Sequence, residues 1–155
     1  MNKWLLLLVL FLGLSLTACS NDDKSLSGEE PPNTVVEIGG ETYETVLGSY
    51  CWKRMCVDTV GPPELLEGID PIKVKPGEKI TILMDYNPMP NEVYMYQMVN
   101  DEDSTETEVK MKNNRFKAPT EKGVYYYTYS VWWKDEKEKN VSHGDAFYSF
   151  AIEVD

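Results

Sequence analysis

The sequence predicts an all-β protein, an antiparallel sandwich of two sheets with about seven or eight strands. Apolar and polar residues alternate along most of the chain after residue 33, which is the period of a half-buried strand. Gly-Gly, Pro-Gly and Asn-Pro pairs interrupt this alternation at short intervals and mark turns. Helical periodicity is nearly absent, so an antiparallel sandwich is favoured over a parallel α/β fold with crossover helices.

The expected strands are the alternating segments between these turns. A hairpin is expected around Gly39-Gly40, because paired glycines supply the positive φ of a tight turn. A second hairpin is expected across Lys112-Asn113, and a short strand at residues 71–75 precedes Pro76-Gly77. The other segments are residues 34–38, 41–47, 79–86, 92–99, 106–111, 114–118, 124–133 and 145–154.

The last two segments are the longest and the most regular. Alternate residues of a strand share one face, so each segment is expected to turn one apolar row toward the core. These rows are Tyr125, Tyr127, Tyr129, Val131 and Trp133, and Ala146, Tyr148, Phe150, Ile152 and Val154.

Residues 118–127 resemble the corner and penultimate strand of immunoglobulin-like domains in bacterial surface proteins. The resemblance rests on a Gly-x-Tyr-x-Tyr strand at Gly123, Tyr125 and Tyr127, which in such domains pairs with the final strand. It implies an immunoglobulin-like sandwich. Through residues 48–52 and 144–148, the chain as a whole is similar to uncharacterised lipoproteins of Bacillus-like bacteria, a resemblance that carries no function with it.

The first nineteen residues have the features of an exported lipoprotein. Lys3 precedes an apolar run that is too short to span a bilayer comfortably, as in a secretory signal. Leu16-Thr17-Ala18-Cys19 then matches a lipobox, in which the cysteine sulfur receives a diacylglycerol. The alternative is an ordinary signal peptide or membrane anchor that happens to contain a cysteine.

This start divides the chain into three parts. Residues 1–18 are expected to be a cleaved signal peptide, and residues 19–33 a lipidated Cys19 followed by a polar, flexible tether. Residues 34–155 are expected to form one sandwich domain. The expected location is the extracytoplasmic face of the cell membrane, held there by lipid on Cys19.

The charge of the chain restricts its partners. The full sequence has a formal net charge of −11, and removing residues 1–18 takes away Lys3 and no acidic residue. Nucleic acid is therefore not an expected partner, because phosphate binding requires a basic surface. The same charge argues against a domain lying flat on anionic lipid. Solubility is the simplest reason for such an acidic surface.

The two remaining cysteines, Cys51 and Cys56, are expected to form a disulfide in an exported domain. Five residues of extended strand would separate their Cα atoms by roughly 16 Å, so the chain must reverse between them. A metal site would need further ligands, and the only histidine, His143, is far away in sequence. A redox pair usually has a Cys-x-x-Cys spacing.

No residue is assigned a catalytic role, and no metal or cofactor is expected. His143 with Asp145 and a nearby serine would be needed for hydrolysis, but no serine lies in a nucleophile-elbow motif. The chain has more aromatic residues than one core needs, and this excess favours a binding surface instead. The candidate binding residues are Tyr50, Trp52, Arg54, Tyr126, Trp132 and His143.

Two classes of function remain open from the sequence. The first is a binding module that recognises an envelope protein, peptide or glycan. The second is an envelope enzyme regulator such as a peptidase inhibitor, with a hydrolase less favoured. A concave pocket formed by Trp52, Trp132 and His143 would favour ligand binding, whereas a protruding loop at residues 51–56 would favour inhibition of a cleft.

Overall fold

The computed structural model describes residues 26–99, 105–138 and 140–155. Its elements are β1 (Thr34–Ile38), β2 (Glu41–Glu44), β3 (Val46–Trp52), β4 (Met55–Val57), α2 (Pro62–Leu65), β5 (Ile72–Val74), β6 (Lys79–Met84), β7 (Glu92–Val99), β8 (Glu106–Glu108), β9 (Arg115–Lys117), β10 (Gly123–Lys134) and β11 (Ser142–Val154). In this described part, no helix has the length and apolar character needed to cross a membrane.

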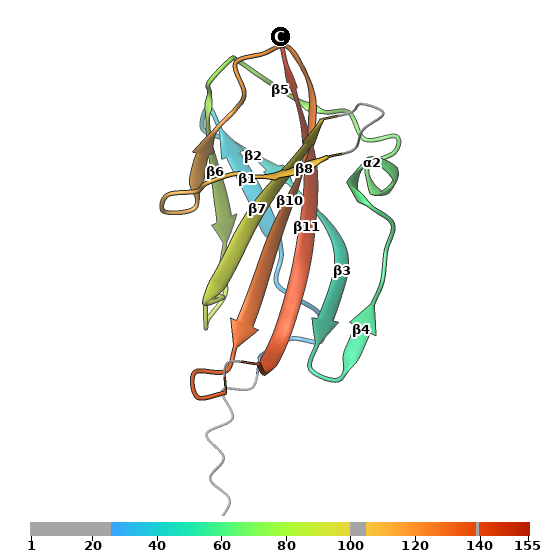
Figure 1. Cartoon of the computed structure of the whole chain (residues 1–155), viewed down its shortest axis with the longest axis vertical. Helices are drawn as coiled ribbons and strands as arrows, with labels where there is room; N and C mark the ends of the chain where they lie inside the picture. The colour runs from blue at the N-terminus through green and yellow to red at the C-terminus, as the bar shows by residue number, and fades with distance from the viewer. Residues whose placement is uncertain (1–25, 100–104, 139) are drawn as a thin grey trace, which may run out of the picture.

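The strands form two sheets that pack face to face, as the alternation predicts (Figure 1). The smaller sheet has the order β2-β1-β6-β9, and the larger has the order β4-β3-β11-β10-β7-β8. β5 adds to β11 in parallel, and the other pairings are antiparallel. The β-sandwich prediction is therefore confirmed, although the described residues contain eleven strands and several have only three or four residues.

The second half of the chain has the strand arrangement of an immunoglobulin-like domain. β6 pairs with β9 in one sheet, while β10 lies between β7 and β11 in the other, as strands B–E and C–F–G do. Near the start of β10, the Tyr125 hydroxyl donates a hydrogen bond to the Glu121 carbonyl at 3.0 Å. This bond across a corner, from a tyrosine at the start of the penultimate strand, is the tyrosine corner of such domains.

The first four strands widen this sandwich on both sides. β1 and β2 extend the smaller sheet beyond β6, and β3 and β4 extend the larger sheet beyond β11. The chain changes sheets at Thr45, whose backbone N–H and hydroxyl both donate to the Thr34 carbonyl, at 3.3 and 2.7 Å. The prediction of one strand over residues 41–47 is therefore wrong, because these anchoring bonds end β2 at Glu44.

The predicted pairing of residues 106–111 with 114–118 is also wrong. The turn itself exists, with positive φ at Asn113 and Asn114 and reciprocal backbone hydrogen bonds between Lys112 and Arg115. Beyond it, the two segments join opposite sheets, since β8 pairs with β7 and β9 pairs with β6. Burial of Phe116 between the sheets, 5.1 Å from the Tyr127 ring, accompanies this separation.

The core consists of the inner faces of both sheets, and the two rows predicted for the last strands are all buried in it. Tyr127 stacks on Phe150 with ring centroids 5.1 Å apart, and its hydroxyl donates to the Gln97 side-chain carbonyl at 2.7 Å. The Tyr148 hydroxyl donates to the Pro32 carbonyl. Burial raises the pKa of Tyr129 to about 12, so these phenols stay neutral in the core.

Packing begins before the expected domain boundary at residue 34. Leu26 is only 4% exposed and belongs to the core. The Trp52 indole N–H donates to the Gly28 carbonyl at 3.3 Å, and the Tyr86 hydroxyl donates to the Ser27 carbonyl at 3.0 Å. Residues 26–33 therefore lie on the sandwich instead of forming the end of a free tether. The expected signal peptide, lipobox and Cys19 lie outside the described residues.

Candidate functional site

Two of the six candidate binding residues are buried in the core. Tyr50 is 8% exposed and Trp52 is 1% exposed. The Trp52 indole packs edge to face against Trp133 and Tyr86, with ring centroids 4.9 and 5.8 Å apart. The prediction that these two rings contribute to a binding surface is therefore wrong. Both lie on the face of β3 that points into the core. The short neighbouring strand β4 gave no sequence signal that showed which face of β3 is buried.

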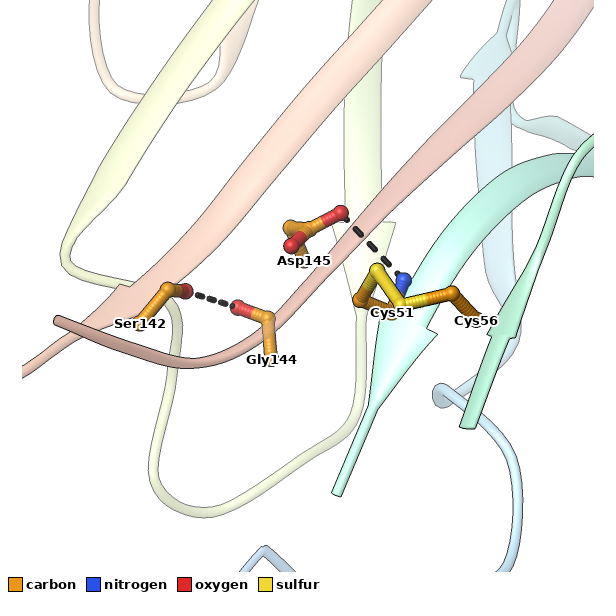
Figure 2. Close-up of a disulfide and its surroundings, with 5 residues drawn as sticks. All are labelled: Cys51, Cys56, Ser142, Gly144 and Asp145. Atoms are coloured by element: carbon orange, nitrogen blue, oxygen red, sulfur yellow. Dashed lines mark hydrogen bonds between the residues drawn. A yellow bond between two sulfur atoms is a disulfide. The ribbon is translucent and has the colours of Figure 1, made fainter. Parts of the chain in front are cut away.

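Arg54 and His143 lie apart from the other candidates. Arg54 is exposed in the turn between β3 and β4, where Lys53 has a φ of 58°. The His143 imidazole Nε2 lies 3.0 Å from the Asp135 carboxylate, and not against Asp145 as a hydrolase would need. The Ser142 hydroxyl donates to the Gly144 carbonyl at 2.8 Å (Figure 2), so it is bonded to backbone and is not positioned as a nucleophile for His143.

Tyr126 and Trp132 are half-buried on the outer face of the larger sheet. Trp132 lies at the centre of a group of rings that we call the aromatic face, defined as Tyr94, Tyr96, Trp132 and Phe147. Trp132 packs edge to face against Tyr94 and against Phe147, with centroids 5.6 Å apart in both pairs. Tyr94 stacks on Tyr96 at 6.4 Å. The result is a continuous row of partly buried rings from β11 across β10 to β7.

Strand register brings these rings together. Ser130 pairs with Phe147 on one side and with Tyr94 on the other, so one side chain from each of three strands meets in a single row. Ser130 is 1% exposed, and no hydrogen-bond partner is found for its hydroxyl among the described residues. The aromatic side chains in and beside this row thus exclude water from the middle of an outer sheet face, where polar residues are usual.

Acidic residues are the neighbours of Trp132 on both adjacent strands. In the sheet register, Trp132 pairs with Asp145 on β11 and with Glu92 on β7. The negative charge of Glu92 raises the pKa of the Tyr94 hydroxyl beside it. Partial burial raises the pKa of Asp145, while a hydrogen bond from the Cys51 backbone N–H opposes this shift. The Lys134 ammonium lies over the Trp132 ring, 5.7 Å from its centroid.

The disulfide lies at the edge of the larger sheet, in line with the paired residues Trp132 and Asp145 (Figure 2). Cys51 and Cys56 pair directly across β3 and β4 and are joined by a disulfide, with Cα atoms 4.0 Å apart. Cys51 also pairs with Asp145 on the next strand. The predicted disulfide and the predicted chain reversal between the cysteines are confirmed.

Replacing both Cys51 and Cys56 with serine is expected to lower the free energy of unfolding by about 2 kcal/mol, because the closed loop is short. The domain should still fold, since the bond lies at a sheet edge and the core does not depend on it. Urea unfolding followed by circular dichroism measures the loss. A variant that does not fold at all would contradict this modest contribution.

A separate pocket of about 340 Å³ opens at the end of the sandwich where β10 meets β11. We call it the end pocket; its walls include the apolar side chains of Leu26, Met89 and Trp133, with Asp135 and His143 among its polar groups. The backbone N–H groups of the β10–β11 turn, together with His143, lower the pKa of Asp135. This volume is near the lower end of the range for small-molecule sites.

Trp52, Trp132 and His143 therefore do not form the shared pocket that would have favoured ligand binding. His143 lines the end pocket, Trp52 is buried, and Trp132 lies on the outer sheet face. Tyr94, Tyr96 and Phe147 were not predicted as neighbours of Trp132. Alternation indicates that residues 92, 94, 96 and 98 share a face, but the register that places this face beside Trp132 has no local signal.

Across the described ranges, no three His, Cys, Asp or Glu side chains gather in a way that would hold one metal ion. No protein-family model matches the chain, and no curated protein or solved structure matches it.

Proposed function

We propose that this protein is a lipid-anchored binding module on the extracytoplasmic face of the cell membrane, and that it binds an envelope partner through the aromatic face. The observation that carries the binding proposal is the row of four rings that are only partly buried on one sheet face. Aromatic side chains supply a large contact area with few torsions to immobilise, which is why binding surfaces are enriched in them.

The anchor proposal rests on the lipobox at residues 16–19 and the apolar run before it. Leu26 is already packed on the sandwich, so only seven residue steps separate it from Cys19. A fully extended chain of that length reaches at most about 25 Å. Leu26 lies at the end pocket, so this end of the sandwich would stay near the membrane, and the C-terminus lies at the opposite end (Figure 1).

This orientation leaves the aromatic face accessible from the side. The strands run roughly along the long axis of the sandwich (Figure 1), and the aromatic face lies on the outer side of β7, β10 and β11. A partner embedded in the membrane, or lying on the surface beside the protein, would reach the face without displacing lipid.

Replacing Cys19 with alanine is expected to move the protein from the membrane fraction to the soluble fraction, or to leave it unprocessed, because no lipid can be attached. Fractionation and mass spectrometry of the N-terminus measure both outcomes. The control is the same substitution at Cys56, which should leave the membrane attachment unchanged. An unmodified Cys19 at the N-terminus of the membrane-bound wild type would contradict the anchor proposal.

Replacing Trp132 with alanine is expected to weaken capture of the envelope partner by about tenfold or more, the loss typical of a central aromatic contact. Its neighbours Tyr94 and Phe147 would also lose their packing contact. Quantitative capture from envelope extracts, compared with wild-type protein, measures the effect. Unchanged capture would contradict the proposed site, and activity on an envelope substrate that disappears in His143→Ala would favour the hydrolase alternative.

A peptidase inhibitor is the second candidate function, favoured by the β3–β4 hairpin. Its turn carries the exposed Lys53 and Arg54, β4 begins at Met55, which is 55% exposed, and the disulfide closes the hairpin behind them. A disulfide-closed turn with exposed side chains is preorganised, which favours binding in the cleft of an enzyme. If inhibition is the function, Arg54→Ala should abolish the capture that Trp132→Ala leaves intact.

A further inference from the structure

The aromatic face already holds a cation. The Lys134 ammonium lies over Trp132, in the position at which a positive charge is attracted to the negative face of an indole. Asp145 interacts electrostatically with Lys134, and Trp132 stands between Asp145 and Glu92 in the sheet register. An ammonium group at this position thus meets an indole ring together with the Asp145 carboxylate, and Glu92 is the neighbour of Trp132 on the other strand.

The surroundings extend the same chemistry beyond Trp132. Glu108 pairs with Tyr96, and Glu106 pairs with Met98, so both carboxylates belong to the outer face of the larger sheet. Both are exposed, in a chain whose net charge is −11. The aromatic row is therefore bordered by carboxylates at the β7–β8 edge as well as beside Trp132. A basic partner is attracted to such a surface, and an acidic or nucleic-acid partner is repelled.

We propose that the aromatic face recognises a lysine-bearing segment of a protein partner, and that Lys134 occupies the ammonium position until the partner replaces it. This inference rests on the proposed binding function and names its ligand class. The partner's lysine takes the place over Trp132 between Asp145 and Glu92, and its apolar side chains lie on Tyr94 and Tyr96. Lys134 then moves to solvent.

The backbone around Lys134 allows this exchange without a change in the strand. The Lys134 N–H donates to the Asn91 side-chain oxygen, and the Asn91 amide donates to the Lys134 carbonyl, both at 2.8 Å. These bonds fix the end of β10 through the main-chain atoms of Lys134 and do not involve its side chain. The Lys134 side chain is consequently free to leave Trp132, and it can be replaced without loss of the strand end.

The test is a titration of the full protein, extracted in a polyoxyethylene detergent that carries neither sugar nor ammonium groups. The probe is a capped Lys-Leu-Lys-Leu-Lys peptide, with capped Glu-Leu-Glu-Leu-Glu and a neutral oligosaccharide of N-acetylglucosamine as comparisons. We expect the lysine peptide alone to bind, with an affinity that falls as salt is added.

If the inference is correct, one variant strengthens binding of the lysine peptide and two others weaken it. Lys134→Gln should bind the lysine peptide about threefold more tightly, because the position over Trp132 is vacated. Trp132→Ala should weaken binding about tenfold, and the isosteric pair Glu92→Gln with Asp145→Asn about fivefold. Lys117→Gln, on the exposed side of β9 in the smaller sheet, changes the net charge equally and should leave the affinity near that of wild type.

Failure of this inference is distinguishable from failure of the proposed function. If the oligosaccharide binds in a Trp132-dependent way and the lysine peptide does not, the aromatic face is a binding site and the lysine assignment is overturned. If Lys134→Gln and Lys117→Gln strengthened binding of the lysine peptide equally, net charge alone would explain the effect. That result would also overturn the lysine assignment. A circular dichroism spectrum equal to wild type is required of each variant, and the carboxylate pair gives an independent measurement if Trp132→Ala does not fold.

Discussion

Replacing Trp52 with alanine is expected to lower the free energy of unfolding by about 3–5 kcal/mol, the range for removing a large aromatic side chain from a packed core. Trp52 is 1% exposed and contacts Trp133 and Tyr86 through its ring edges. Its removal leaves a cavity between the two sheets. It also breaks the hydrogen bond from the indole to Gly28, which holds the N-terminal segment on the domain.

The measurement is urea unfolding followed by far-ultraviolet circular dichroism, with the melting temperature as a second readout. A loss of this size should lower the melting temperature by more than about 10 °C in a domain of this length. Trp132→Ala is the matched control, since it removes the same side chain from the outer face of the same sheet, and we expect it to cost only about 1 kcal/mol. Equal losses in the two variants would contradict the assignment of Trp52 to the core.

These two tryptophans show which side-chain directions the alternation of apolar and polar residues predicts and which it does not. Within one strand, alternation separates neighbours correctly, so Trp132 faces outward and Trp133 inward. For Trp52 the same reasoning requires knowing which face of β3 is buried. That depends on the pairing of β3 with β11 across more than ninety residues of sequence. Local patterns contain no information about such a pairing.

The candidate site shows the same division. Trp132 could be identified from its own strand, but the aromatic face also needs Phe147 from β11 and Tyr94 from β7. The turn at Asn113 and Asn114 was predictable in place, whereas the separation of its arms into two sheets was not. The immunoglobulin-like strand order was accessible because the segment around Tyr125 has a recognisable local pattern with its own hydrogen bond.

The N-terminal boundary was misplaced because Leu26 is a single apolar residue in a polar segment. Composition indicates that such a segment cannot fold by itself. It packs because the domain offers a site for one apolar side chain, made where Gly144 lies opposite Trp52. The absence of a side chain at Gly144 creates this space and so leaves room for Leu26 to pack.

Gly144→Ala is therefore expected to destabilise the protein by about 3 kcal/mol, at the upper end of the usual cost of overfilling a core. Alanine has no less intrinsic preference for a strand than glycine, so propensity alone would predict no loss. A Cβ atom at this position would lie 2.6 Å from Leu26 Cδ1 and 2.7 Å from Trp52 Cε3. Leu26 has a flexible side-chain end and can turn aside, whereas the Trp52 ring is held by Trp133 and Tyr86.

A double-mutant cycle separates these two contacts. If Leu26 packs against Gly144, then Gly144→Ala should cost at least about 0.5 kcal/mol less in a Leu26→Ala background, because one of the two close contacts is gone. The remaining cost then reports on Trp52. Urea unfolding of the wild type, both single variants and the double variant provides the four free energies of unfolding. Strict additivity would mean that Leu26 does not occupy this space, and the short reach between Cys19 and the sandwich would no longer follow.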